Sequence, residues 1–137
     1  LGDVMNQTIY AYISDGGIQE EISQGAGRLA GHLGLDNLIM FYDSNDIQLS
    51  TETDAVTSED VAKKYEAWHW KVMTIDGNDP DAIRAALTEA KAVTGQPTLI
   101  IGKTAVLTVL LWVVRHISIP SKIWVATLKI HSRFLLK

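Results

Sequence analysis

Short apolar runs alternate along the chain with stretches in which apolar residues recur every three or four positions. Runs of β-branched, aliphatic and aromatic residues predict strands, whereas recurrence at helical spacing predicts amphipathic helices. We expect strands over residues 8–13, 37–43, 70–75 and 97–101, and helices over residues 18–33, 59–68 and 82–93. Such alternation predicts parallel strands joined by helical crossovers, and therefore an α/β fold with an open, mainly parallel sheet. Residues 46–57 match neither pattern and are expected to be irregular.

Local signals mark the expected helix ends. Thr57 or Ser58 is the expected N-cap of the second helix, and Asp79 that of the third, with Pro80 in its first turn. Gly34 is placed to terminate the first helix.

The first helix contains three glycines, Gly25, Gly27 and Gly31. Each lowers helix stability by up to about 1 kcal/mol relative to alanine, so we expect close packing to offset that cost.

Polar loops follow the first two strands at the points where they end. Asp15 and Gly16 follow the first strand, and Asn45 and Ile47 follow the second. Because parallel strands present their carboxyl ends at one edge, the Asp15 carboxylate, the Asn45 amide oxygen and the Ile47 carbonyl are expected to meet there. This oxygen set suits Mg²⁺ holding a diphosphate, and the helix start after Asp15 favours an anion. Taken alone, the Asp-Gly loop is more simply interpreted as a turn.

The sequence around these loops resembles the transketolase family over residues 8–104. The resembling words follow one another in the family's order: Ile18-Gln19-Glu20, Glu21-Ile22-Ser23-Gln24, Leu29-Ala30-Gly31-His32-Leu33, Asn37-Leu38-Ile39, Tyr42-Asp43-Ser44-Asn45, Glu59-Asp60-Val61-Ala62-Lys63-Lys64-Tyr65-Glu66-Ala67-Trp68 and Pro97-Thr98-Leu99-Ile100. The chain departs from the family at Ser14 and Glu21, where the family has glycine.

The resemblance implies a thiamine-diphosphate-binding fold and assigns site residues. Asp15 and Asn45 would bind Mg²⁺ or Ca²⁺ through side chains and Ile47 through its carbonyl, while Gly16 would lie against the diphosphate. Glu20 matches a family glutamate near the subunit interface and the cofactor, although a first-turn helix carboxylate explains it equally well.

Two histidines within the resembling region are given no catalytic role. His32 matches a family histidine and is expected to be a hydrogen-bonded packing residue. His69 stands where relatives usually have glycine.

The activity implied by the resemblance is that of a cytoplasmic, homodimeric transferase of the pentose phosphate pathway. It moves a two-carbon ketol unit from a ketose phosphate to an aldose phosphate with thiamine diphosphate and Mg²⁺. The family's other active-site histidines and its cofactor-activating glutamate lie in segments that this chain does not match. We therefore predict no catalytic residue here and an inactive isolated chain.

Two alternative functions remain open. One is a non-catalytic remnant without cofactor; the other is a fragment of another thiamine-diphosphate enzyme, such as a deoxyxylulose-phosphate synthase, against which the word Tyr65-Glu66-Ala67-Trp68 argues. No Gly-x-Gly-x-x-Gly follows a strand, which argues against a nicotinamide-binding domain.

Charge divides the 137 residues into two segments. Residues 1–104 contain all 16 acidic residues and seven of the 12 basic ones, a net charge of −9, whereas residues 105–137 carry +5. The change predicts a partial cofactor-binding domain, 1–104, followed by an atypical apolar, basic tail, 105–137. A frameshift would explain this tail, since reading 120–134 one base earlier can give a transketolase-like stretch; a natural tail of another kind is the alternative.

Composition excludes several further classes. The overall charge of −4 argues against nucleic acid as a partner. The apolar run 105–114 is too short for a bilayer span of roughly 20 residues. The absence of cysteine excludes disulfides and thiolate metal sites. The first residue is Leu1, and we expect the chain to begin inside a longer protein.

Overall fold

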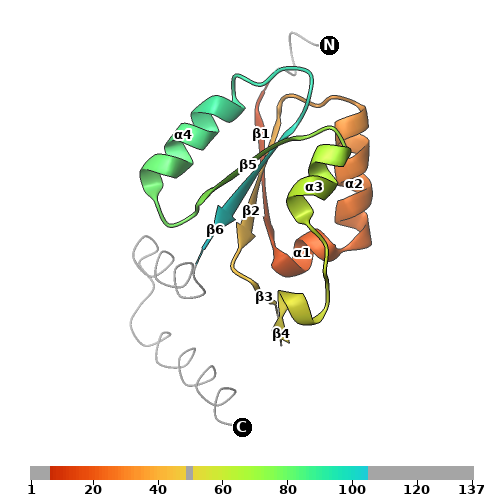
Figure 1. Cartoon of the computed structure of the whole chain (residues 1–137). Helices are drawn as coiled ribbons and strands as arrows, with labels where there is room; N and C mark the ends of the chain where they lie inside the picture. Colours follow the sequence, from red (N-terminus) through yellow and green to blue (C-terminus); the bar gives the residue numbers. More distant parts are fainter. Residues whose placement is uncertain (1–6, 49–50, 105–137) are drawn as a thin grey trace, which may run out of the picture. The chain divides into compact units, whose positions relative to one another are not determined.

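The four predicted strands pair as one parallel sheet in the order β1-β2-β6-β5 (Figure 1). The computed structural model describes residues 7–48 and 51–104. The strands are β1 (Ile9–Ser14), β2 (Leu38–Ser44), β5 (Lys71–Asp76) and β6 (Thr98–Lys103). β2 and β6 lie in the centre and are the most completely buried, as expected for strands covered on both faces. The expected α/β fold with an open parallel sheet is confirmed.

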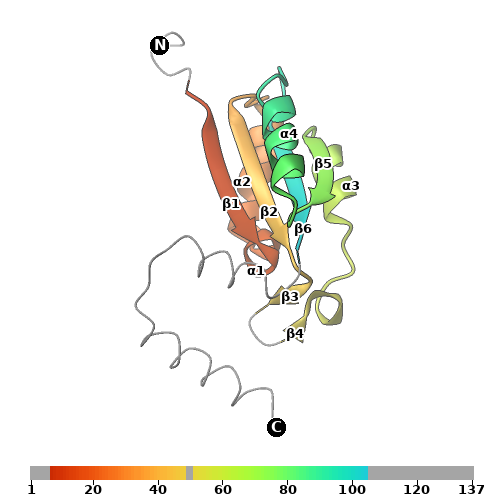
Figure 2. The same ribbon diagram turned by 90° about the vertical axis from the view of Figure 1, so that its left-hand side faces the viewer.

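Helices connect the strands and cover both faces of the sheet (Figures 1 and 2). They are α1 (Asp15–Gln19), α2 (Glu21–His32), α3 (Val61–Ala67) and α4 (Pro80–Ala90). Between β2 and α3, the segment predicted to be irregular contains the two-residue strands β3 (Ile47–Gln48) and β4 (Thr51–Glu52), which pair antiparallel, and a 3₁₀ turn, η1 (Thr53–Ala55).

Each face of the sheet has its own apolar cluster. On the α2 face, side chains from α1, α2 and α3 pack on alternate residues of the central strands, among them Met40, Tyr42, Leu99 and Ile101. On the α4 face, Ala86 and Ala90 of α4 pack on Ile39 and Ile100. The pleat directs successive side chains to opposite faces, which accounts for the nearly continuous apolar sequences of β2 and β6.

The predicted long helix over 18–33 is broken in two. Glu20 has an extended conformation, with φ −64° and ψ 135°, and separates α1 from α2. The helix that follows the first polar loop therefore begins at Asp15 and has only five residues, whereas one helix over 18–33 was predicted.

The predicted caps are partly confirmed. Asp79 caps α4 by accepting a hydrogen bond from the backbone of Asp81, and Pro80 is the first helical residue. The N-cap of α3 is Asp60, whose carboxylate accepts from the Lys63 N–H at 3.1 Å. Thr57 accepts from the Glu59 N–H instead, so the predicted cap at Thr57 or Ser58 is wrong.

The glycines of α2 differ in their surroundings. A Cβ on Gly27 would lie 3.2 Å from the Tyr65 ring, and one on Gly31 would overlap the Trp68 carbonyl oxygen, which confirms close packing at both. A Cβ on Gly25 would meet nothing within 4 Å, so the prediction is wrong there. Gly34 ends α2 with φ +61°, as predicted. His32 is exposed at the end of α2, so its predicted packing role is wrong.

The predictions for residues 105–137 lie outside the described residues and stay predictions. Among the helices of residues 7–48 and 51–104, none has the length and apolar character needed to cross a membrane.

Candidate functional site

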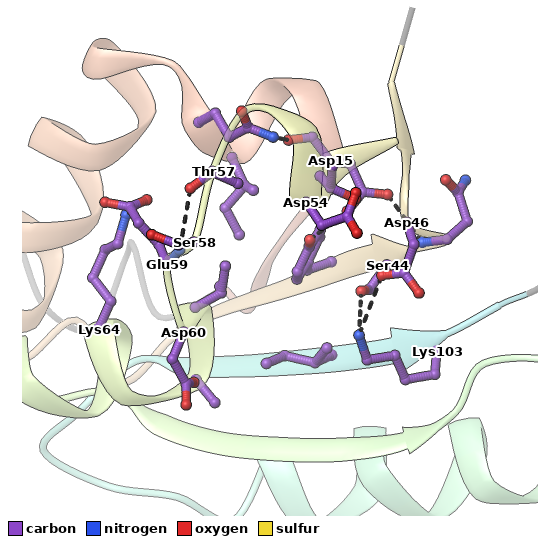
Figure 3. Close-up of a pocket in the computed structure, with 18 of the residues that line it drawn as sticks. Asp15, Ser44, Asp46, Asp54, Thr57, Ser58, Glu59, Asp60, Lys64 and Lys103 are labelled. Atoms are coloured by element: carbon purple, nitrogen blue, oxygen red, sulfur yellow. Dashed lines mark hydrogen bonds and ion pairs between the residues drawn. The ribbon is translucent and has the colours of Figure 1, made fainter. Parts of the chain in front are cut away.

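A pocket of about 720 Å³ lies at the carboxyl edge of the sheet (Figure 3). Its walls come from α1, from the loop after β2, from the end of β6, from the β3–β4 ribbon, and from the segment that leads into α3. The parallel register brings these elements together, because Ser14 pairs with Asp43 and Ser44 pairs with Lys103. The two polar loops singled out in the sequence therefore meet at one edge, as predicted.

Asp15 is fixed within this pocket by its two carboxylate oxygens. The side chain is buried, with 1% exposed. Its Oδ1 accepts a hydrogen bond from the Tyr42 hydroxyl at 2.5 Å, and its Oδ2 accepts from the Asn45 backbone N–H at 2.9 Å. A carboxylate offers about four acceptor positions, so these two bonds leave capacity for a cation.

Tyr42 orients Asp15 through its hydroxyl group. It was not among the site residues predicted from the sequence. Burial, followed by the hydrogen bond to Asp15, raises the pKa of Tyr42 well above its usual value. The phenol therefore remains a donor at neutral pH and holds the carboxylate as an acceptor. Strand pairing places this contact across 27 residues of sequence, a separation that local pattern does not reveal.

The Asn45 loop has a compact, well-defined conformation. The Asn45 side-chain oxygen accepts from the Ile47 N–H at 3.1 Å, while Asp46 between them has φ 63°. Thr53 donates its N–H to the Asp46 carbonyl at 3.0 Å, which ties the loop to η1. The structure thus joins Asp15 to the Asn45–Ile47 loop. That Asp15, Asn45 and Ile47 share one metal ion stays a prediction.

Neither of the two remaining predicted site residues, Gly16 and Glu20, is among the residues that line the pocket. Gly16 has open space beside it, since an added Cβ would meet nothing within 4 Å. Glu20 is exposed at the break between α1 and α2. Its expected place near a subunit interface stays a prediction.

Hydrogen bonds of two glutamine side chains hold the backbone of α1 next to Asp15. Gln19 donates from Nε2 to the Asp15 carbonyl at 3.0 Å and to the side chain of Gln48 at 3.1 Å. Gln24 in turn donates to the Gln19 carbonyl at 3.0 Å. These bonds tie α1 to α2 and to β3, the strand that begins at Ile47.

Charge in the pocket favours a cation. Its acidic lining residues are Asp15, Asp46, Glu52, Asp54, Glu59 and Asp60, and its basic ones are Lys64 and Lys103. A bare polyanion would be repelled by this excess of carboxylates, whereas a divalent cation would neutralise part of it. In the described part of the chain, no three His, Cys, Asp or Glu residues gather as a metal cluster. A metal at Asp15 would therefore depend on neutral oxygens and on oxygens of a ligand, which matches how Mg²⁺ binds with phosphates.

Comparison with known proteins identifies the relatives of this chain. The sequence profile described as "Transketolase, thiamine diphosphate binding domain" matches residues 2–109. The chain belongs to the transketolase family.

Individual transketolases resemble this chain both in sequence and in structure. Transketolase 2 of Escherichia coli is 42% identical over 105 residues, covering 76% of this chain and 16% of the relative. The transketolase of Physarum polycephalum is 44% identical over 105 residues, covering 75% of this chain and 16% of the relative. The solved transketolase of Campylobacter jejuni superposes with a TM-score of 0.71 at 40% identity, covering 74% of this chain and 16% of that one.

The chain spans only about a sixth of the length of these transketolases. Family membership thus covers the thiamine-diphosphate-binding domain, and the activity of the whole enzyme does not follow from it for this chain.

Proposed function

We propose that this chain is the part of a transketolase that holds the metal ion and the diphosphate of thiamine diphosphate. The hydrogen bond between the Asp15 carboxylate and the Asn45 backbone carries the proposal, because it joins the two loops that supply the metal ligands. The family's description as a thiamine-diphosphate-binding domain supports the same cofactor.

The residues present fit this group by their donor chemistry. Asp15 and Asn45 would hold Mg²⁺, or Ca²⁺, through side-chain oxygens, and Ile47 through its carbonyl. Gly16, the neighbour of Asp15, would lie against the diphosphate, and an added Cβ there would meet nothing within 4 Å. When bound, thiamine diphosphate supplies the nucleophilic carbon that takes up a two-carbon ketol unit from a ketose phosphate and passes it to an aldose phosphate.

In this proposal the chain binds and orients rather than catalyses. Asp15 is held by Tyr42 and by the Asn45 backbone before any metal arrives, so little ordering is needed at binding. The sugar phosphates and the second subunit of a homodimer belong to the full-length enzyme. The isolated chain should therefore bind the cofactor without transferring ketol units.

Calorimetric titration of the full 137-residue chain with thiamine diphosphate tests the proposal. We expect binding that requires Mg²⁺ and disappears with a chelator. Asp15→Asn should weaken it by about tenfold or more, because the substitution keeps the shape but removes the charged ligand. Asp81→Asn, which removes the same charge from the exposed start of α4, is the matched control and should bind as wild type.

A folded wild-type chain that binds no thiamine diphosphate at saturating Mg²⁺ would overturn the proposal. It would favour the alternative of a non-catalytic remnant.

A further inference from the structure

Two lysines line the pocket, and their ammonium groups are bonded differently. Lys64 has 16% of its side chain exposed and pairs with Glu59. Its Nζ also donates to the Gln24 side chain at 3.4 Å and lies 5.8 Å from the centre of the Trp68 ring. This lysine is held between α2 and α3 and is not free to reach a ligand.

Lys103 is held more loosely and lies beside the Asn45–Ile47 loop, whose oxygens are the predicted metal ligands. It ends β6, and 56% of its side chain is exposed. Its Nζ donates to the Ser44 hydroxyl at 2.8 Å and lies 3.7 Å from an Asp46 carboxylate oxygen, as the dashed lines in Figure 3 show. Ser44 and Asp46 are the sequence neighbours of Asn45, so the Lys103 ammonium contacts the residues on either side of this predicted metal ligand.

We propose that Lys103 binds the diphosphate directly, donating to its oxygens beside the metal ion. The inference rests on the proposed function and adds a residue to it. An ammonium has three donors, and the bond to Ser44 leaves two. The ion pair to Asp46 is long, and its carboxylate is 79% exposed, so little is lost when Lys103 turns to a phosphate. A charge-assisted bond to a phosphate oxygen is shorter and stronger.

Because the pocket is lined by acidic residues, binding of a diphosphate requires a positive side chain in addition to the metal ion. A diphosphate carries more negative charge than one divalent ion neutralises, and six carboxylates surround the site. Of the two lysines that line the pocket in the described part of the chain, Lys103 is the one whose ammonium can reach a ligand.

A purely structural role for Lys103 predicts a different result. If the lysine only clips Ser44 and Asp46 together, its loss disorders the Asn45 loop and weakens the metal and the diphosphate together. If it binds the diphosphate, its loss removes a positive charge beside the metal. Mg²⁺ alone then binds as well as before or better, whereas the diphosphate binds less well.

The test is two calorimetric titrations of the full chain, with Mg²⁺ alone and with thiamine diphosphate at saturating Mg²⁺. For Lys103→Gln we expect thiamine diphosphate to bind about tenfold or more weakly, the loss typical of a hydrogen bond to a charged group. Mg²⁺ affinity should be unchanged or higher. Lys103→Arg should stay within about threefold of wild type, since it keeps the charge. Lys91→Gln removes the same charge at the end of α4, outside the pocket, and should change neither titration.

Inorganic diphosphate at saturating Mg²⁺ is the second probe and should show the same weakening in Lys103→Gln. Parallel losses of Mg²⁺ and diphosphate affinity, or unchanged diphosphate affinity, would overturn the role of Lys103. Both of those results leave the cofactor proposal standing, because wild type still binds. Absence of binding by the folded wild type overturns both.

Discussion

The two faces of the sheet are covered in different ways. On the α2 face three helices pack on the sheet, and α2 approaches the end of α3 so closely that Gly31 lies directly against the Trp68 carbonyl. The Trp70 indole also donates to the Gly27 carbonyl at 2.8 Å across the same contact. On the α4 face a single helix packs on β2, β5 and β6 (Figure 2). There Tyr12 of β1 remains 63% exposed.

This difference follows the position of the candidate site. Asp15, Tyr42 and Lys103 belong to the α2 face or to its edge, and Ile18 and Tyr65 of its core also line the pocket. A metal site needs ligands held in a fixed arrangement, and close backbone packing supplies that rigidity. The α4 face contributes to stability through side-chain burial, which tolerates more change.

The largest effect is expected for Gly31→Ala. Its Cβ would overlap a backbone oxygen, so α2 and α3 must move apart. We expect the free energy of unfolding to fall by about 2 kcal/mol or more, even after the gain of about 1 kcal/mol that alanine brings to a helix. Urea denaturation of the full chain measures it. Gly25→Ala in the same helix, where the Cβ meets nothing within 4 Å, is the matched control and should gain stability.

Equal stability changes in these two variants would show that the α2 face is not packed through its backbone.

A smaller loss is expected for the same substitution on the α4 face. A Cβ on Gly102 would overlap the tip of the Phe41 ring, which is half-buried and can rotate away. We expect Gly102→Ala to cost about 1 kcal/mol, at the low end for an overpacked site. In a Phe41→Leu background the cost should largely disappear. A cost that persists there would mean that the strand backbone, and not the ring, is the obstacle.

The sequence pattern was sufficient to predict the parallel sheet and to predict that the two polar loops lie at the same edge. Period and run length placed four strands, and parallel pairing then required that Asp15 and Asn45 share one edge. The break at Glu20 was not visible, because the apolar positions of α1 and α2 continue one helical pattern across it.

Contacts between side chains distant in sequence were also missed. Tyr42 with Asp15, and Lys103 with Asp46, are set by strand register rather than by local composition. Lys103 is a basic residue at the carboxyl end of a predicted strand, and it pairs with Ser44. Its position at that strand end was the one sequence feature that could have indicated a site residue. The cap at Asp60 was missed because Thr57 and Ser58 have equally good capping chemistry, and the local sequence does not distinguish a helix that starts after them from one that starts after Asp60.

The two faces also differ in how a tyrosine hydroxyl on each is hydrogen-bonded. Tyr12 on the exposed α4 face donates to the buried Asp43 carboxylate at 2.6 Å. Tyr65 in the core of the α2 face is buried, and its hydroxyl has no hydrogen-bond partner among the described residues. Burial also raises the pKa of Tyr65 to about 12.

Tyr12→Phe should therefore cost about 1 kcal/mol, because it leaves a buried carboxylate one donor short, whereas Tyr65→Phe should be neutral or stabilising. Thermal unfolding of both variants at pH 7 measures the contrast. A greater loss at Tyr65 than at Tyr12 would mean that burial, rather than pairing of the hydroxyl, decides the cost.

The smallest effect concerns the ends of the two helices that meet on the α2 face. α2 and α3 end with the same pair of backbone hydrogen bonds, in which the first two residues after the cap donate back into the last turn. The donor and acceptor pairs are Gly34 to Gly31 and Leu35 to Ala30 in α2, and His69 to Glu66 and Trp70 to Tyr65 in α3. The motif requires a left-handed residue directly after the cap, which is Gly34 with φ +61° in α2 and His69 with φ 69° in α3.

His69→Gly should therefore stabilise the chain. Histidine carries a Cβ that disfavours this backbone conformation, and glycine does not. Glycine also adds freedom to the unfolded chain, which offsets part of the gain, so we expect about 0.5 kcal/mol in the free energy of unfolding. His69→Asn should lie between the two, because asparagine tolerates the left-handed region better than most residues. Gly34→Ala is the converse variant and should lose stability, since its Cβ would also come within 2.8 Å of the Gly95 carbonyl oxygen. If His69→Gly unfolds at a lower urea concentration than wild type, the exposed imidazole stabilises the end of α3 by more than its backbone costs.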